Sequence, residues 1–578
     1  MKQIFTLSAA TLIALSASAV TPKIYDNLQV LAISPDGKIM ISELDGVLTV
    51  QNTETGDKKE FASENIDGYS VGQGRAFTND GMFIGSIPSG DVAAPAYYKD
   101  GEWHTLNVPN PQFSSYAQGV TPDGSLIVGI TGLAKMSIDD GPVPMQVPII
   151  WERKSDGTYA DGKILPYPSL DFTGRVPQYV TAITVSSDGK TVVGQVQESG
   201  GVMTSLITYS LGDNNEWSYD TSYDKMCNPN NLVFPEYPGE FSLTMPQKTD
   251  FMTAENKAAY EAALDAWYEE GTYDENTRPN PDNYMSDSEK AAYNAALAEY
   301  NSAYQTWSDK YYAFDAVYSE CINSGHALEF NSVFLSGDEK SVISSVVISV
   351  EDPNSWLGFS NEYMPAVINT SDASYEIYPN KNVNISSLTE DNTLFGFTVD
   401  SQTMMRQAMV YLPNTKEPIS LLEYYQTYLP ETAQWIKDNM FHPMEIFDME
   451  TMEIVTLPDY PCTGTPFITP DGRVLATAVQ NLFDDNSEAQ IFTYLLPSTA
   501  AAVKNVADES DMKLAALKGG RILVDGNVSE ITVYDLSGAV LFKSKADSKI
   551  IETGLNAGMY VVKATGNNVN KTIKAIFR

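Results

Sequence analysis

The sequence has few residues of the types that most often carry catalysis. Among its 578 residues there are only three histidines and three cysteines. It contains neither an H-E-x-x-H zinc motif nor a Walker A phosphate loop. Acidic residues are too numerous for one pair to stand out as a glycosidase dyad. The sequence therefore names no catalytic residue, and it leaves open whether the protein is an enzyme or a binding protein.

Positive charge is also scarce. The chain has 36 Lys and Arg against 75 Asp and Glu, which gives a formal net charge of −39. Residues 511–578 hold ten Lys or Arg against six Asp or Glu, and Lys2 is the one charge before residue 23, so residues 23–510 carry −44. Such a surface repels nucleic acid and anionic lipid. We expect no nucleic-acid partner, and the simplest role of the charge is to keep an exported protein in solution.

Long apolar runs are confined to the N-terminus. Residues 1–19 combine a basic start at Lys2, an apolar centre from Ile4 to Leu15 and the small residues Ala17-Ser18-Ala19. This is the pattern of a secretory signal peptide with its cleavage site. No later stretch approaches the ~18–20 apolar residues of a transmembrane helix. The sequence predicts export to the cell surface or the medium, with no transmembrane segment.

One short phrase recurs along the rest of the chain: an apolar residue, Ser or Thr, any residue, Asp and usually Gly, followed by an apolar run. It occurs seven times, at 33–37, 77–81, 120–124, 185–189, 335–339, 388–392 and 468–472. Several copies read Pro-Asp-Gly, in which Pro presets φ, Asp bonds back to the backbone and Gly accepts a positive φ. Each copy therefore predicts a tight turn between two antiparallel strands.

The positions around each Asp follow the same logic. The Ser or Thr two places before it offers a hydroxyl to the turn. Two copies lack the Gly: Asn392 tolerates a left-handed conformation, whereas Glu339 does not, so a different turn is expected at Glu339. Four residues after each Asp the sequence is always apolar, which predicts a core position. These residues are Met40, Ile84, Ile127, Val192, Val342, Phe395 and Leu475.

The spacing of the turns predicts an all-β repeat fold. The first two intervals between turn aspartates are 44 and 43 residues, close to the ~40–50 residues of a four-stranded propeller blade. We therefore predict a seven-bladed β-propeller over residues 20–497. Its last blade has only three strand candidates, at 462–468, 474–480 and 490–496, so Lys23-Ile24-Tyr25 is expected to supply the fourth and close the ring.

The repeated phrase also carries a family resemblance. Ser-x-Asp-Gly followed by a Val-Gly pair resembles the repeat of extracellular HAF-type propellers, over most of residues 28–496. The resemblance implies the fold and says nothing about activity.

Residues 240–325 interrupt the repeats with helical spacing. Ser286-x-x-Glu289 is a capping box, and aromatic residues follow at alternating spacings of four and three. A shorter helix, at about 253–270, repeats the Lys-Ala-Ala-Tyr phrase of the longer one. We predict an antiparallel helical hairpin that packs its aromatic seam between the two helices, with the longer helix projecting from the propeller.

A smaller insertion spans residues 418–445. Ser420–Leu429 and Pro430–Met440 read as two short amphipathic helices, and Pro430 suits the first position of a helix. After the propeller, residues 498–510 have the Ala- and Ser-rich, polar composition of a linker.

Residues 511–578 predict a separate small β-domain. The phrases Val533–Gly538 and Leu555–Val561, and the basic C-terminus Lys571–Arg578, resemble the C-terminal sorting domain of type IX secretion substrates of Bacteroidetes. The resemblance implies an immunoglobulin-like β-sandwich, the type IX machinery as partner, passage through the outer membrane and removal of the domain. Its motif residues here are Asp535, Gly538, Leu555, Gly558 and Tyr560.

Candidate ligand-contact residues come from the innermost strands. Seven residues before the turn Asp, five of the seven copies have a neutral polar residue: Gln29, Gln73, Thr181, Asn331 and Asn384. Polar side chains there suit either a water-filled channel or a ring of ligand contacts at its mouth. No metal or other cofactor is implied, although Asp484-Asp485-Asn486-x-Glu488 could hold Ca²⁺ without having EF-hand spacing.

The cysteines leave two alternatives open. Cys227 and Cys321 flank the helical insertion, so a disulfide at its base is possible in an exported protein. Buried free thiols are equally compatible with the sequence, and the third cysteine, Cys462, favours neither.

Together these patterns predict an exported, non-catalytic protein that binds a glycan or a protein at the cell surface. Two alternatives stay open. The protein could be a surface enzyme acting on glycans or peptides at the propeller mouth, or an envelope structural protein that works through the helical insertion.

Overall fold

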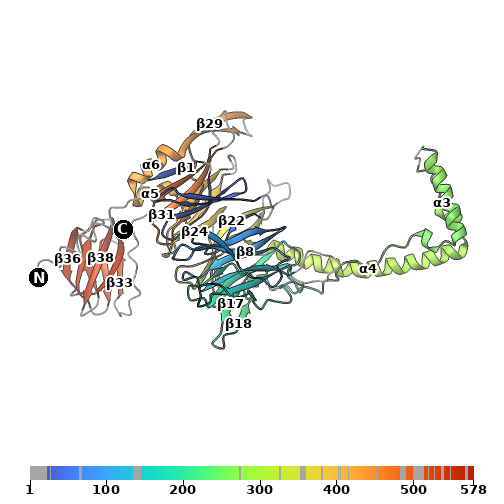
Figure 1. Ribbon diagram of the computed structural model, residues 1–578, viewed down its shortest axis with the longest axis horizontal. Helices are drawn as coiled ribbons and strands as arrows, with labels where there is room; N and C mark the ends of the chain where they lie inside the picture. The colour runs from blue at the N-terminus through green and yellow to red at the C-terminus, as the bar shows by residue number, and fades with distance from the viewer. Residues whose placement is uncertain are drawn as a thin grey trace.

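The computed structural model describes residues 22–498 and 513–577 with short gaps. The residues left out within these ranges are 27, 64–67, 134–144, 272–274, 325–326, 352–358, 379–381, 401–402, 404, 414, 449–451, 482–489, 518–519, 526–527, 536–538, 547, 557 and 567–569. The signal peptide and most of the linker therefore lie outside the described residues. Figure 1 shows a body of β-sheets, a long helix leaving it on one side, and a small β-domain on the other.

The body consists of antiparallel sheets that follow one another along the chain. The first two contain β2 (Gln29–Ile33), β3 (Ile39–Leu44), β4 (Val47–Asn52) and β5 (Lys58–Ala62), then β6 (Ser70–Val71), β7 (Phe83–Ser89), β8 (Val92–Lys99) and β9 (Glu102–Thr105). The next two are joined by one parallel bridge and contain β10 (Ser115–Val120), β11 (Leu126–Gly132), β12 (Gln146–Glu152) and β13 (Lys163–Ile164), then β14 (Tyr179–Val180), β15 (Thr184–Val185), β16 (Thr191–Gln197), β17 (Thr204–Leu211) and β18 (Trp217–Asp220).

Three more sheets complete the body. Their strands are β19 (Glu329–Phe330), β20 (Phe334–Leu335), β21 (Ser341–Glu351), β22 (Phe359–Asn369) and β23 (Tyr375–Ile377), then β24 (Val383–Leu388), β25 (Leu394–Val399), β26 (Arg406–Tyr411) and β27 (Ile419–Ser420), and finally β30 (Thr465–Ile468), β31 (Val474–Asn481), β32 (Gln490–Pro497) and β1 (Lys23–Asp26).

The repeated phrase forms the same hydrogen-bonded turn in every copy. The Ser or Thr hydroxyl donates to the carboxylate of the Asp two residues later, at 2.5–2.8 Å. The predicted core positions four residues after each Asp are all fully buried. The Ser186 hydroxyl lowers the pKa of Asp188, and Ser336 does the same for the pKa of Asp338. The predicted turn chemistry is confirmed.

The expectation of a different turn at Glu339 is wrong. Its backbone has φ 58° and its N–H donates to the Ser336 carbonyl at 2.8 Å, as the glycines do in the other copies. A side chain in this conformation is strained, and its carboxylate gains contacts that glycine would lack. It accepts from the N–H and hydroxyl of Ser187, at 2.8 and 2.6 Å, and lies 3.4 Å from Arg75. The strained residue thus links the turns of two neighbouring sheets to a third sheet.

The apolar core is divided into clusters that lie between neighbouring sheets. Ile41 and Phe83 share the cluster between the first two sheets, and each later pair of sheets shares a cluster in the same way. Another cluster joins Val474 and Leu495 of the last sheet to Met40 of the first. The sheets therefore pack in a closed ring, the arrangement of a β-propeller.

The N-terminal strand closes this ring, as predicted. Strand β1 pairs with β32 in antiparallel register, with Lys23 opposite Leu495 and Asp26 opposite Phe492. The Lys23 ammonium also donates to the Thr53 carbonyl of the first sheet, at 2.6 Å. Residues more than 460 positions apart in the chain therefore share one sheet.

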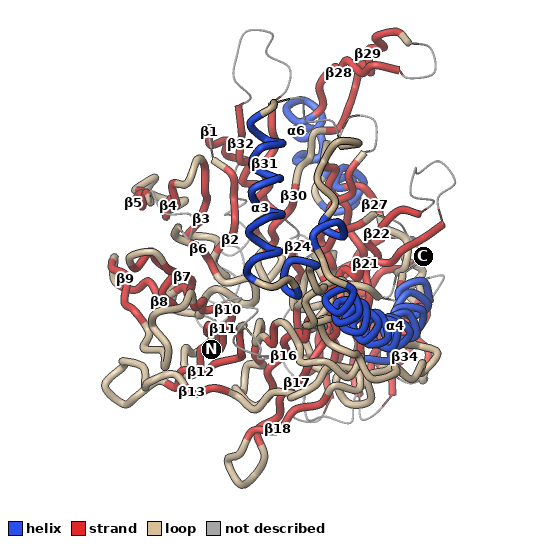
Figure 2. The backbone as a smooth tube through the Cα atoms, turned by 90° about the vertical axis from the view of Figure 1, so that its right-hand side faces the viewer, coloured by secondary structure: helices blue, strands red, loops and turns tan. Residues whose placement is uncertain are grey.

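The helical insertion is not an antiparallel hairpin. It contains α2 (Asp224–Cys227), η1 (Lys248–Phe251), α3 (Ala254–Glu269), η2 (Pro281–Tyr284) and α4 (Asp287–Ser324). In a hairpin the end of α3 would meet the start of α4, but here the two helix starts meet. The Glu289 carboxylate of α4 accepts from the N–H of Thr253 at 2.5 Å and from the Asn256 side chain at 2.7 Å. Figures 1 and 2 both show α3 standing across the far end of α4.

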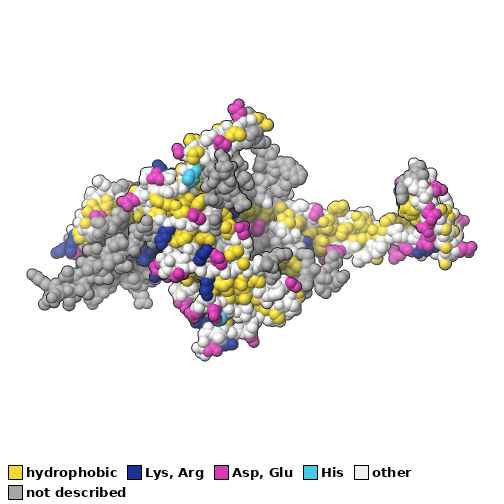
Figure 3. Space-filling model, turned by 45° about the horizontal axis from the view of Figure 1, so that its top comes forward, with side chains coloured by type: hydrophobic (Ala, Val, Ile, Leu, Met, Phe, Trp, Pro, Cys, Tyr) yellow, Lys and Arg dark blue, Asp and Glu magenta, His cyan; other side chains and the backbone are white. Residues whose placement is uncertain are grey.

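The aromatic seam of α4 is covered by an extended segment of residues 228–247 instead of by α3. Phe241 packs against Tyr300, Tyr304 and Trp307, at ring-centroid distances of 5.4, 5.3 and 5.6 Å. Nearer the propeller, Phe234 packs against Phe314 at 5.6 Å. With 38 residues, α4 is about 57 Å long. We call α3, α4 and residues 228–286 the stalk; Figure 3 shows apolar side chains along α4 and acidic ones at its tip.

The smaller insertion forms the two expected helices, α5 (Leu421–Tyr428) and α6 (Pro430–Met440). Ser420 caps α5 through a capping box with Glu423. A hairpin of β28 (Phe441–Asp448) and β29 (Glu453–Pro461) follows α6 and was not predicted. Buried Tyr425 and Ile436 join the core between the last two propeller sheets, so these helices cover that part of the ring.

The described residues of the C-terminal domain form seven strands in two sheets. One contains β33 (Lys513–Leu517), β34 (Arg521–Asp525) and β37 (Ile550–Glu552), and the other β35 (Val528–Tyr534), β36 (Val540–Lys545), β38 (Gly558–Gly566) and β39 (Asn570–Phe577). Ile522 and Ile551 of the first sheet share an apolar core with Val533 and Phe577 of the second. The domain therefore has its own core.

Candidate functional site

Of the five predicted contact residues, Gln29 begins β2 and Asn384 lies in β24, whereas the other three follow the short strands β6, β14 and β19: Gln73, Thr181 and Asn331. Gln29, Gln73 and Asn331 are exposed, and Thr181 and Asn384 are half-buried. The Thr181 hydroxyl accepts the backbone N–H of Gln195 at 2.8 Å, so this residue has a structural role in the strand pair β14–β16. Gln73 presents its backbone N–H to the Gln118 side chain at 3.0 Å. Gln29 lines a cavity. The ligand role of the five residues stays a prediction.

A cavity of about 430 Å³ opens between the first, sixth and seventh sheets. Gln29 and Gly464 line it, and both stand seven residues before a turn Asp in their own repeats. Gly464 has φ 62°, and a Cβ there would lie only 1.9 Å from the Ala478 carbonyl oxygen. Only glycine fits that position, which explains why this copy lacks the polar residue of the others. We call this cavity the mouth cavity.

Arg406 is the cation of the mouth cavity. Its Nη1 donates to the hydroxyl of Thr465 at 3.0 Å, and its guanidinium lies over the Phe397 ring at 4.7 Å from the centroid. Val30, Phe467 and other apolar side chains form the rest of the wall. Sequence reasoning missed Arg406 and Thr465, because they belong to different repeats and only the ring brings them together.

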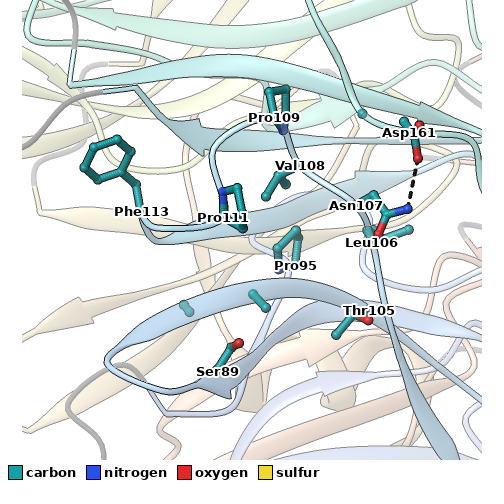
Figure 4. Close-up of a pocket in the computed structure, with 13 residues that line it drawn as sticks. Ser89, Pro95, Thr105, Leu106, Asn107, Val108, Pro109, Pro111, Phe113 and Asp161 are labelled. Carbon is teal, nitrogen blue, oxygen red and sulfur yellow. Dashed lines mark hydrogen bonds between the residues drawn. The ribbon is translucent and has the colours of Figure 1, made fainter.

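A second cavity, of about 520 Å³, lies at the edge of the ring between the second and third sheets. Figure 4 shows Asn107 and Asp161 at one end of it, joined by a hydrogen bond of 2.9 Å, and Phe113 at the other. Pro95, Val108, Pro109 and Pro111 lie between them (Figure 4). Its apolar wall and its amide–carboxylate pair could hold a small polar ligand, and no periodic pattern in the sequence predicts this cavity.

One sequence match to a catalytic pattern has no catalytic context. Gly68-Tyr69-Ser70-Val71-Gly72 fits the G-x-S-x-G pattern of hydrolases, which requires the Ser on a strained turn between a strand and a helix. Ser70 instead lies in strand β6, and its hydroxyl is hydrogen-bonded to that of Ser86 at 2.6 Å. This serine therefore holds two strands together.

Metal and membrane features can be judged only for the described part of the chain. There, no three His, Cys, Asp or Glu side chains are grouped so that they could share a metal ion. The possible Ca²⁺ loop at Asp484–Glu488 lies outside the described residues. The helices within the described ranges do not combine the length and apolar character needed to cross a membrane.

The base of the stalk is held by a buried network. Arg175 pairs with the fully buried Glu198 carboxylate at 2.6 Å, and the Tyr318 hydroxyl of α4 donates to the same carboxylate at 2.7 Å. Cys227 and Cys321 lie beside it as buried free thiols, with the Cys321 Sγ 3.3 Å from the Cys227 carbonyl oxygen. The structure thus brings the two cysteines together, and a disulfide between them stays a prediction.

The sorting-motif residues have structural contacts. The Asp535 carboxylate accepts the Ala539 N–H at 2.8 Å, and the Tyr560 hydroxyl donates to the Asn556 carbonyl at 3.0 Å. Leu555 packs against the domain core, and Gly558 begins β38. Gly538 lies outside the described residues.

No protein-family model matches the chain, and no curated protein matches it either. Similar solved structures include PorZ, an essential bacterial surface component of the type IX secretion system of Porphyromonas gingivalis: 8% identity and TM-score 0.27, over 95% of this chain and 70% of PorZ. They also include TolB from Acinetobacter baumannii (9%, TM-score 0.27, over 86% and 83% of the two chains). Prolyl oligopeptidase B from Galerina marginata is a further example (10%, TM-score 0.33, over 96% and 59%). Identities of 8–10% with TM-scores of 0.27–0.33 assign no function to this chain.

Proposed function

We propose that this protein is an exported seven-bladed β-propeller that binds a protein or glycan ligand at the mouth of its ring, without catalysis. The mouth cavity carries the proposal. Its polar groups are an amide, a hydroxyl and a guanidinium, from Gln29, Thr465 and Arg406, with apolar side chains beside them. Groups of this kind bind through hydrogen bonds and apolar contact, the usual composition of a binding pocket.

The blade number is supported by the repeats. Each of the seven turns joins the first two strands of a sheet, and the clusters between sheets close the ring through β1 and β32. The body spanning 20–497 would then hold the binding site, while the stalk and the α5–α6 segment are insertions into it.

The route of export is supported by the sequence. The signal peptide at residues 1–19 implies entry into the periplasm. The motif residues of 511–578 then imply passage through the outer membrane by the type IX machinery, loss of an immunoglobulin-like sorting domain, and delivery to the surface or the medium. The separate core of this domain fits its removal from a folded propeller.

The stalk supports a second candidate role, as an arm that holds another envelope protein. The specific observation is its exposed aromatic residues: Tyr304 and Tyr312 of α4 are 45% and 65% exposed. A catalytic role at the mouth, on glycans or peptides, is the remaining alternative.

A capture experiment separates these roles. The mature protein, beginning at residue 20, would be incubated with glycan arrays and with cross-linked envelope extracts, and its captured ligands identified by mass spectrometry. We expect Gln29→Ala with Thr465→Val to abolish capture, and Tyr312→Ala to leave it unchanged. The reverse result would favour the stalk, and turnover of a captured ligand that depends on the mouth residues would establish an enzyme.

A further inference from the structure

Arg406, which lines the mouth cavity, differs from Arg75 and Arg175 in its partners. Arg75 and Arg175 each pair with a glutamate, at 3.4 and 2.6 Å. In the part of the chain that the structure describes, Arg406 contacts the Thr465 hydroxyl and the Phe397 ring, and no carboxylate pairs with it. Its guanidinium is therefore open to a carboxylate that a ligand supplies.

The guanidinium is held ready for such a partner. Its planar group has five N–H donors, of which Thr465 takes one, so a fork of donors is left for a carboxylate. The stacked Phe397 ring and the Thr465 hydroxyl restrict its rotation, which lowers the entropy lost on binding. Arg406 is exposed although it lines the cavity, so a ligand can reach it.

The rest of the wall narrows the chemistry of the ligand. Apolar side chains line part of it, beside the polar groups: Val30, Leu31, Met405, Phe467, Val479 and Ile491. An apolar side chain next to a carboxylate would fit both parts of the cavity. The Gln29 amide can donate to and accept from a peptide group.

We propose that the mouth cavity binds the free C-terminus of a protein whose last side chain is apolar. Arg406 pairs with the terminal carboxylate, Gln29 bonds the last peptide group, and the apolar wall takes the last side chain. This inference rests on the proposed binding function and names the ligand class for that site.

The test uses short peptides with the mature protein. N-acetyl-Gly-Gly-Gly-X peptides, with X as Ala, Val, Leu or Phe, would be compared as free acids and as C-terminal amides by saturation-transfer NMR. We expect the Val, Leu or Phe acid to bind at least about tenfold more tightly than its amide, because a hydrogen-bonded charge pair is worth that much. Arg406→Gln should remove this preference. Arg473→Gln is the matched control, because Arg473 has the same charge, lies at the turn of the seventh sheet and is paired with Asp471 at 3.3 Å.

The outcomes distinguish this inference from the function on which it rests. Equal binding of acid and amide, or an acid preference that survives Arg406→Gln, would overturn the C-terminus inference. Failure of all the peptides to bind, while captured ligands still depend on Gln29 and Thr465, would overturn it and keep the binding function. If capture is independent of these residues, the site itself is wrong.

Discussion

The ring and the stalk are specified by different physical means. In the ring, one turn is repeated seven times, and each copy satisfies its own backbone groups with a hydroxyl and a carboxylate two residues apart. In the stalk, α4 depends on a segment far earlier in the chain, whose Phe241 and Phe234 cover its aromatic face. Local chemistry that repeats can be read from sequence, whereas a single long-range packing choice cannot.

The ring and the stalk should also differ in the cooperativity of their unfolding. Each propeller sheet shares a core cluster with both neighbours, so loss of one sheet exposes two others. The stalk tip contacts mainly itself, through pairs such as Tyr260–Tyr284 and Phe251–Tyr293. We therefore expect damage to the ring to be global and damage to the stalk to be local.

The largest effect should follow removal of strand β1. Deleting residues 20–26 from the mature protein removes the outer strand of the last sheet and leaves the outer edge of β32 unpaired, while β31 stays its partner on the other side. At ~1 kcal/mol for each backbone hydrogen bond, the loss should reach about 4 kcal/mol of unfolding free energy or more, measured by urea denaturation. Ile24→Ala is the control and should change little, since Ile24 is 49% exposed. A deletion variant that unfolds at the wild-type urea concentration would contradict the closed ring.

A smaller but still global effect is expected for one turn hydroxyl. Thr469 is fully buried; it donates to Asp471 at 2.7 Å and accepts from the Val474 N–H at 3.1 Å. Thr469→Val leaves these groups unsatisfied and should cost about 2 kcal/mol. The matched change on the stalk is Thr306→Val. The Thr306 hydroxyl is exposed and forms a hydrogen bond of 2.9 Å within its own helix. If thermal unfolding shows an equal loss of stability for the two variants, the ring and the stalk do not differ in the way we expect.

Within the stalk, Phe241→Ala should act locally. The substitution removes the ring that covers Tyr300, Tyr304 and Trp307, so residues 228–247 should detach from α4. Hydrogen exchange of the amides near 300–311 should accelerate by about tenfold or more, since opening of this segment loses several aromatic contacts. The main thermal transition should stay at the wild-type temperature. A shift of that transition would show that the stalk and ring unfold together.

The smallest effect concerns pH at the stalk tip. Hydrogen bonds from the Thr253 N–H and from Ser286 lower the pKa of Glu289 to about 2, against about 4.3 in an unfolded chain. Because the folded-state pKa is lowered, the stabilisation is complete above about pH 4.3 and disappears as pH falls toward 2. Glu289→Gln should therefore lower helix content at pH 6, by circular dichroism, and the difference from wild type should shrink toward pH 2. A difference that is constant with pH would exclude this role of the carboxylate.

Several particular positions could be predicted because their determinants are local. Each of these features depends on residues only a few positions away in the chain. They are the turn hydroxyls, the seven buried positions from Met40 to Leu475, the Ser286–Glu289 cap and the start of α6 at Pro430. Strand β1 was predicted for a different reason. The last repeat lacked a strand, and an unpaired sheet edge is costly.

Tertiary structure decided what depended on distant partners. Glu339 adopts a left-handed backbone conformation, which glutamate disfavours. Its carboxylate is stabilised there by a hydrogen bond from Ser187 and by the ion pair with Arg75. The Glu289 carboxylate accepts hydrogen bonds from the start of α3 as well as from the cap of its own helix. These bonds bring the starts of α3 and α4 together, whereas the sequence pattern predicts a hairpin. Arg406, Thr465 and Gln29 meet only because the ring closes. The sequence by itself thus determined the repeats, their turns and the closure of the ring, and only the three-dimensional packing assembled the stalk and the cavity, because their contacts join residues that no local pattern connects.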